Sequence, residues 1–356
     1  MSKSPSRPTF AYVGCFTTAK RKARGKGIAL FRIDPATGKW SYVEACDVIP
    51  NPSYIAIDRT QRFMYSAHGD SDDVCSYARD PRTGKLKFLN KQKTEGDNSS
   101  TVEVHSSGRW VLLSTGPGVA LFPVKADGSL GPHSDLIVPE GKPGPLRDEQ
   151  EGPHPHQAAF DLTGKFVVVP DKGLDKVLVF RLDADRGRLV PTDNLDARYG
   201  AVPRHITFHP GRPFAYLVME NDSTVFAYHW DTSAGKLKPF QRVSTLPTDY
   251  VGDNMAAEIA ILPSGKFLYA SNRGHQSIAI YAVNSAKGTI ESVGWEPVQG
   301  KKPRFFCLAR DGSHLYAANE DSHTIVEFRI NAKTGKLTPT GQVIETGSPT
   351  CIVFAG

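Results

Sequence analysis

Histidine, arginine and glutamate side chains recur in short motifs along the middle of the chain, where they could do acid–base chemistry on an anion. The motifs are His154-Pro155-His156, Arg204-His205, Glu220 and Arg273. Arginine holds oxygen-rich anions through paired hydrogen bonds, and histidine or glutamate can accept a proton from water. These residue types therefore predict a site that binds an anionic small molecule and moves a proton on it.

A glycine turn that recurs about every 50 residues indicates which elements bring these motifs together. In each copy the glycine separates two apolar runs, and consecutive glycines are 44 to 59 residues apart. The seven turn glycines are Gly38, Gly84, Gly128, Gly187, Gly235, Gly288 and Gly335. Glycine turns between alternating strands at this period are typical of the blades of a β-propeller.

A second turn falls earlier in each period, and its copies number six rather than seven. The chain ends after the apolar segment 350–354, where a seventh early turn would fall, and it begins with the apolar segments 9–13 and 27–31. We therefore expect the C-terminal segment to be the first strand of a blade whose next strands are N-terminal, an arrangement that protects sheet edges. The predicted architecture is all-β, a single seven-bladed propeller of four-stranded antiparallel blades at residues 9–356, after a flexible tail at 1–8.

In such a blade the start of the first strand and the end of the second emerge on the same face of the ring. Convergent ionisable groups around a concavity are the default hypothesis for a site. We expect the substrate to contact further residues at these strand ends, and Arg147 from the long connection 140–151. The strand-end residues are His154, His205, Glu258, Asn272 and Arg304. The alternative is a polar collar that only satisfies backbone groups at the strand ends.

The same motifs resemble the lactonase family of seven-bladed propellers. The matching segments are 152–157, 203–205, 219–221, 257–259 and 263–273, and the resemblance extends over essentially the whole chain. The family includes the propeller-type 6-phosphogluconolactonases and the fungal carboxy-cis,cis-muconate cyclases. In the cyclase branch the functional set is a histidine, an arginine, a glutamate and a second arginine, which implies that the catalytic residues here are His156, Arg204, Glu220 and Arg273.

The resemblance implies chemistry at a lactone ring. We expect metal-independent hydrolysis of a sugar lactone, with 6-phosphogluconolactone as the substrate and the pentose phosphate pathway as the setting. The base would be His156 or Glu220, and Arg204 and Arg273 would supply positive charge. The alternatives are a carboxy-muconate-type lactonising cycloisomerase and a noncatalytic propeller that binds a ligand or a protein.

Other signals exclude several kinds of partner. His154-Pro155-His156 has no third and fourth ligand at a recognisable spacing, so we expect no metal and no cofactor. The basic run 20–26 lacks interleaved aromatic residues and the net charge is only +6, which argues against nucleic acid. That run is expected to open on the site face, where it could hold a phosphate or remain a solvated loop. Without an apolar span or a signal peptide, we expect a cytoplasmic protein, monomeric or weakly oligomeric, with no membrane contact.

Overall fold

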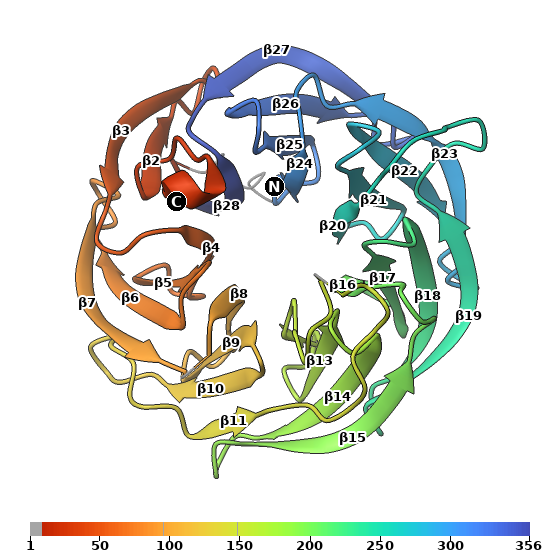
Figure 1. The fold of residues 1–356 in the computed structure, drawn as a ribbon. Helices are drawn as coiled ribbons and strands as arrows, with labels where there is room; N and C mark the ends of the chain where they lie inside the picture. The colour runs from red at the N-terminus through yellow and green to blue at the C-terminus, as the bar shows by residue number, and fades with distance from the viewer. Residues whose placement is uncertain (1–8, 95, 148) are drawn as a thin grey trace, which may run out of the picture.

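Seven four-stranded antiparallel sheets are arranged as a ring around a central channel (Figure 1). The structure is a computed structural model that describes residues 9–94, 96–147 and 149–356. The predicted seven-bladed propeller is thus confirmed, while the predicted tail at 1–8 lies outside the described residues. In the described part of the chain, no helix is long and apolar enough to cross a membrane.

Each blade is built from consecutive strands, except the blade that closes the ring. The closing blade contains, from the channel outwards, β28 (Pro349–Ala355), β1 (Phe10–Cys15), β2 (Ile28–Ile33) and β3 (Trp40–Cys46). The next three blades are β4 (Pro52–Ile57), β5 (Phe63–His68), β6 (Asp73–Arg79) and β7 (Leu86–Lys93); β8 (Asn98–Val104), β9 (Trp110–Gly116), β10 (Val119–Pro123) and β11 (Asp135–Ile137); and β12 (Ala159–Phe160), β13 (Phe166–Asp171), β14 (Lys176–Asp183) and β15 (Arg188–Asp196). The last three are β16 (Pro203–Phe208), β17 (Phe214–Met219), β18 (Thr224–Asp231) and β19 (Lys236–Ser244); β20 (Ala256–Ile261), β21 (Phe267–Asn272), β22 (Ser277–Val283) and β23 (Ile290–Pro297); and β24 (Pro303–Leu308), β25 (His314–Asn319), β26 (Thr324–Ile330) and β27 (Leu337–Glu345). A 3₁₀ turn, η1 (Ala19–Arg21), lies between β1 and β2.

The two ends of the chain close the ring as the turn count predicts. β28 pairs with β1 along its length, with Ala355 opposite Phe10 and Ile352 opposite Val13. The backbone N–H of Gly356 also donates to the side chain of Gln61 in the next blade, at 2.8 Å. The closing blade is therefore held by contacts between residues that are more than 290 positions apart in sequence.

The recurring glycine turns join neighbouring blades as well as neighbouring strands. All seven glycines have positive φ, which explains why the turn selects glycine. Four of their carbonyl groups accept a hydrogen bond from a buried tyrosine hydroxyl of the preceding blade. These pairs are Tyr12 with Gly84 at 2.5 Å, Tyr65 with Gly128 at 3.1 Å, Tyr216 with Gly288 at 3.0 Å and Tyr269 with Gly335 at 2.9 Å.

Register shifts near the channel mouth determine which side chains enter the channel. On β4, β8, β16, β24 and β28 the shift leaves one residue unpaired, and on β20 it leaves two. The shifted residues are Ser53, Ser100, Arg204, Ala257 with Glu258, Arg304 and Thr350. A β-bulge re-aims the side chain of its extra residue, so six blades can each direct a side chain to the channel mouth.

Removal of residues 350–356 tests the closure. The deletion takes away nearly all of β28 and exposes the edge of β1, so we expect loss of the cooperative thermal transition and aggregation. Near-ultraviolet circular dichroism during heating and size-exclusion chromatography measure both.

A circular permutant provides the control. It joins Gly356 to Thr9 by a short linker, omits residues 1–8 and opens the chain in the exposed turn at 332–334, so that every strand is kept. We expect this permutant to remain folded and monodisperse. A deletion variant as heat-stable as the intact chain would contradict the closure.

Candidate active site

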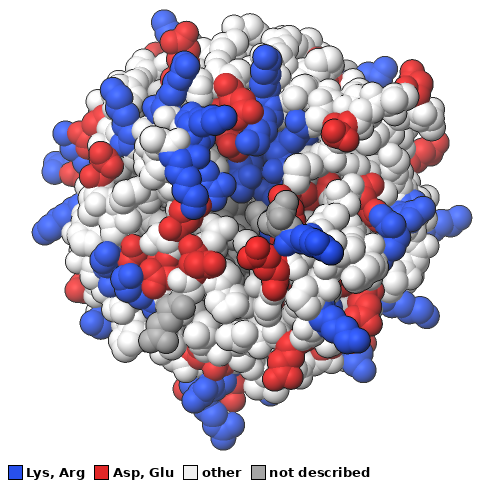
Figure 2. All heavy atoms as spheres, viewed as in Figure 1, with Lys and Arg blue, Asp and Glu red and all other residues white. Residues whose placement is uncertain are grey.

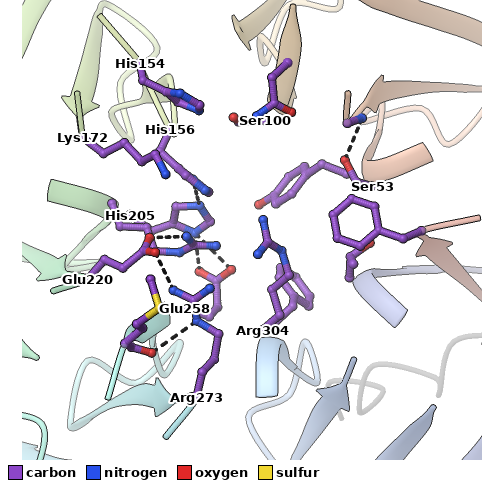
Figure 3. A pocket seen from close by; sticks show the side chains of 18 of the residues that line it. Ser53, Ser100, His154, His156, Lys172, His205, Glu220, Glu258, Arg273 and Arg304 are labelled. Carbon is purple, nitrogen blue, oxygen red and sulfur yellow. Dashed lines mark hydrogen bonds and ion pairs between the residues drawn. The ribbon is translucent and has the colours of Figure 1, made fainter. Parts of the chain in front are cut away.

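A pocket of about 270 Å³ opens at the mouth of the channel (Figures 2 and 3). Its volume lies just below the range of roughly 300–1,000 Å³ for pockets that hold drug-sized ligands, so it fits a molecule the size of one sugar ring. The bulge residues contribute to its wall, which contains Ser53, Ser100, Arg204, Glu258, Arg304 and Thr350. Figure 2 shows Lys and Arg side chains gathered beside the hollow on the side of β24 and β28.

A buried carboxylate between two guanidinium groups forms one side of the pocket. Arg204 bonds one oxygen of Glu220 through Nη1, and Arg273 bonds the other through Nη2 at 2.8 Å. The side chains of Arg204 and Glu220 are each 3% exposed, and that of Arg273 is 7% exposed. Burial opposes the charge of Glu220, but Arg273 and Arg204 outweigh it and hold the pKa of this carboxyl well below its usual value. Glu220 is therefore a fixed anion that orients two cations.

Arg273 is held further by the backbone of the neighbouring strand. Its Nε donates to the carbonyl of Met255 at 3.2 Å, and its Nη2 donates to that of Ala256 at 3.3 Å. Arg204 is held by the bulge of β16 and by Glu220, and its buried Nε has no hydrogen-bond partner among the residues that the structure describes. Both guanidinium groups line the pocket.

A chain of one carboxylate and two imidazoles lies beside these arginines (Figure 3). Nδ1 of His205 is 3.1 Å from both carboxylate oxygens of Glu258, and Nε2 of His205 is 3.0 Å from Nδ1 of His156. Burial, followed by the charge of Arg204, holds the pKa of His156 well below 6.5, and burial also lowers that of His205. Both imidazoles are therefore neutral near pH 7.

With both imidazoles neutral, only one assignment of donors and acceptors is possible along the series Glu258, His205 and His156. Since a carboxylate only accepts, His205 donates its Nδ1–H to Glu258 and its Nε2 must accept. His156 then donates Nδ1–H to His205, which leaves Nε2 of His156 with its lone pair. His156 lines the pocket, and the ring of His154 stacks near it with centroids 6.3 Å apart.

The structure brings most of the predicted site residues together. The pocket wall contains His154, His156, Arg204, His205, Glu220, Glu258, Arg273 and Arg304. The other two lie elsewhere. Asn272 is wholly buried, where its side chain bonds Thr245 and Ser277, and Arg147 is exposed on the connection before β12. From that connection it is Glu149 that reaches the pocket, where it pairs with Lys172 at 2.9 Å.

The basic run at 20–26 contributes less than expected. Arg21 lines the pocket, but both oxygens of Asp70 accept hydrogen bonds from its guanidinium, at 2.7 and 2.8 Å. Lys20 is exposed and pairs with the same carboxylate at 3.5 Å. The cations at 22, 24 and 26 are exposed and lie outside the pocket wall. The cation of this loop that lines the pocket is therefore paired within the protein, and these three exposed cations lie away from the pocket wall.

Several pocket residues were not expected as site residues, among them two lysines and a tyrosine. Lys172 directly follows β13, Lys302 directly precedes β24, and Tyr54 follows the bulge residue of β4. Their positions beside the motifs are a sequence signal for a place in the site. A lysine beside a strand end, however, also fits a solvated surface. No group of three or more His, Cys, Asp or Glu side chains suited to a metal ion occurs among the described residues.

Fold and site together define a class: a seven-bladed propeller with a polar, cation-rich pocket at the channel mouth that contains a histidine with a free nitrogen. Residues 10–354 match the family model described as "Lactonase, 7-bladed beta-propeller", and the chain belongs to this lactonase family.

Relatives of known structure or curated name agree with that membership. The chain is 32% identical over 348 residues to the 6-phosphogluconolactonase of Bacillus subtilis, covering 96% of this chain and 97% of that one. It is 30% identical to the 6-phosphogluconolactonase of Formosa agariphila, over 96% and 99% of the two chains. The solved structure of the periplasmic gluconolactonase of Pseudomonas aeruginosa has a TM-score of 0.89 and 26% identity, over 98% and 99% of the two chains.

The ion triad makes a prediction about stability. Glu220→Gln leaves two buried guanidinium groups without their counter-charge, so we expect it to lower the free energy of unfolding by about 3 kcal/mol or more. Denaturant titration followed by circular dichroism measures the change.

Glu149→Gln is the matched control, because Glu149 pairs with Lys172 but is 45% exposed. A half-exposed pair of this kind contributes less than about 1 kcal/mol. Equal, small effects of the two substitutions would show that the triad does not depend on the charge of Glu220.

Proposed function

We propose that this protein is a lactonase, a carboxylic ester hydrolase that opens a sugar lactone without a metal ion, and that its substrate is 6-phosphogluconolactone, which it converts to 6-phosphogluconate. The observation that carries the proposal is the free Nε2 of His156, supported from behind by His205 and Glu258 and placed beside two fixed arginines. Membership of the lactonase family and the names of the relatives support the same activity.

His156 is the general base in this proposal. A water molecule in the pocket gives a proton to Nε2 of His156 while its oxygen attacks the lactone carbonyl carbon. The imidazolium that forms keeps its Nδ1–H bonded to His205, and His205 remains bonded to Glu258. These hydrogen bonds fix the orientation of the His156 ring, and the carboxylate of Glu258 stabilises the positive charge that develops on the imidazole. His205 and Glu258 thus act as positioning residues rather than as substrate ligands.

Arg204 and Arg273 stabilise the other developing charge. As water attacks, the carbonyl oxygen becomes an oxyanion, and two oriented guanidinium groups favour it over the neutral ground state. The intermediate then collapses with cleavage of the bond between the carbonyl carbon and the ring oxygen. His156 returns its proton to that ring oxygen, which becomes a hydroxyl group, and the new carboxylic acid releases a proton to solvent.

Glu220 does not act as the base in this scheme. Both of its oxygens are bonded to guanidinium groups, and the low pKa of its carboxyl makes it a poor proton acceptor. Its role is to hold the arginines. The alternative of a cycloisomerase has no support among the relatives reported above, which are named as lactonases.

The setting is also part of the proposal. Hydrolysis of a phosphorylated sugar lactone belongs to carbohydrate metabolism in the pentose phosphate pathway, which favours a cytoplasmic location. A periplasmic relative exists in Pseudomonas aeruginosa. Cell fractionation with an antibody to the chain distinguishes the two compartments.

Acid release from freshly prepared 6-phosphogluconolactone tests the function. We expect the protein to accelerate acid release well above the spontaneous rate in a pH-stat, and we expect His156→Gln to lower kcat by about a hundredfold or more. His314→Gln is the control, because His314 begins β25, bonds Ser313 and lies outside the pocket wall. The control should retain full activity, and an equally active His156 variant would remove the proposed base.

The pH dependence follows from the neutral state of His156. Burial and Arg204 lower its pKa well below 6.5, so the base form persists as the pH falls past 6.5 and is lost only at more acidic values. We expect kcat/KM to be constant from pH 8 down to pH 6.5 and to fall only at pH values below 6.5, where His156 becomes protonated. The unphosphorylated gluconolactone is the substrate for this profile, since a phosphate would itself titrate near pH 6. An acid limb centred above pH 7 would contradict the assignment.

A further inference from the structure

Arg304 is a pocket arginine whose guanidinium group makes no close ion pair with a carboxylate of the described residues. It is the bulge residue of β24, its side chain is 24% exposed, and it projects into the pocket (Figure 3). Its closest carboxylate oxygen in the described chain is Oε2 of Glu320, at 3.8 Å from Nε, which is too long for a hydrogen bond. Among the described residues, its guanidinium donates no hydrogen bond. By contrast, Arg204 and Arg273 both bond Glu220.

The neighbours of Arg304 hold it in place and balance its charge only in part. The ring of Phe16 lies 5.4 Å from its guanidinium carbon, a stacking contact that fixes the plane of the group. Glu320 is shared, because it also accepts a hydrogen bond from Lys302 at 3.1 Å. Burial and the like charges of Arg204 and Arg273 lower the pKa of Arg304 to about 10, against the opposing charges of Glu320 and Glu220, so it stays charged at neutral pH.

Arg304 faces the proposed base across the channel. His156 precedes β12, and three steps round the ring, through the blades of β16 and β20, lead to β24. In a ring of seven blades, three steps is the greatest separation. A ligand whose reactive carbonyl lies at His156 can therefore extend its far end towards Arg304.

We propose that Arg304, with Lys302 beside it, is a phosphate subsite that makes the enzyme prefer phosphorylated over unphosphorylated sugar lactones. The proposal rests on the proposed function for the lactone end of the ligand. A guanidinium with free donors matches phosphate oxygens geometrically, and the lysine adds a second charge. Proteins similar to this chain are named for both kinds of substrate, 6-phosphogluconolactone and gluconolactone, and a phosphate subsite would distinguish the two.

Steady-state kinetics on the two lactones tests the subsite. We expect Arg304→Gln to raise KM for 6-phosphogluconolactone about tenfold or more beyond any change in KM for gluconolactone, since a charge-assisted phosphate contact is lost. Arg304→Lys keeps the charge and should fall between the wild type and the glutamine variant. Lys301→Gln removes an exposed charge one residue before Lys302 and is the matched control; its KM ratio should equal that of the wild type.

Binding of the reaction products provides a readout that does not depend on turnover. Calorimetry on the wild-type protein should show tighter binding of 6-phosphogluconate than of gluconate, and Arg304→Gln should abolish the difference while its melting temperature confirms that it is folded. A wild-type protein that lacks lactonase activity but shows this Arg304-dependent preference would overturn the proposed function and support the subsite.

Three results would overturn the subsite while leaving lactone hydrolysis intact. The first is an equal loss on both lactones in Arg304→Gln, which would place Arg304 at the lactone ring. The second is a phosphate preference that survives Arg304→Gln and disappears in Lys172→Gln, which would place the phosphate near His154. The third is a wild-type enzyme with the same KM for both lactones.

Discussion

The buried charge of Glu220 is the constraint on which the arrangement of the pocket depends. A carboxylate without contact to water is costly unless opposite charges and hydrogen bonds compensate it. Arg204 and Arg273 supply both, one to each oxygen. This compensation fixes the two guanidinium groups and, in the proposed mechanism, is the reason that His156 rather than Glu220 accepts the proton. The remaining pocket arginine, Arg304, is paired less closely: its Nε lies 3.8 Å from Oε2 of Glu320, and in the proposed subsite its donors are available to a ligand.

The propeller assembles these groups from distant parts of the chain because each blade presents the same position to the channel mouth. The register shifts on β16 and β24 turn Arg204 and Arg304 inward, and the longer shift on β20 does the same for Glu258. His156 arrives differently, from a segment before the short strand β12, where its N–H bonds the carbonyl of Pro170 at 3.0 Å. The ring closure by β28 and β1 keeps all these strand starts around one pocket.

The sequence was sufficient to predict the ring, its closure and eight of the residues that line the pocket, because turn glycines and strand ends are local signals. It was insufficient where the outcome depended on partners that are distant in sequence. Asn272 and Arg273 are adjacent, yet Asn272 turns to Thr245 while Arg273 reaches Glu220. The pairing of Arg21 with Asp70, 49 residues away in sequence, leaves no signal in the basic run itself. The choice between His156 and Glu220 likewise required the hydrogen bonds that each one makes.

The bulge positions also explain how one scaffold can serve different lactones. A bulge residue is not paired in the strand ladder, so its side chain can change with little effect on the sheet. In this chain the same position carries serine on β4 and β8, threonine on β28 and arginine on β16 and β24. Replacement of Arg204 would be costly because its charge compensates the buried carboxylate of Glu220. Arg304 makes only a long ion pair with Glu320, which also bonds Lys302, so under the proposed subsite exchange at this position would alter recognition of the far end of the substrate while the His156 hydrogen bonds and the Glu220 triad stay in place.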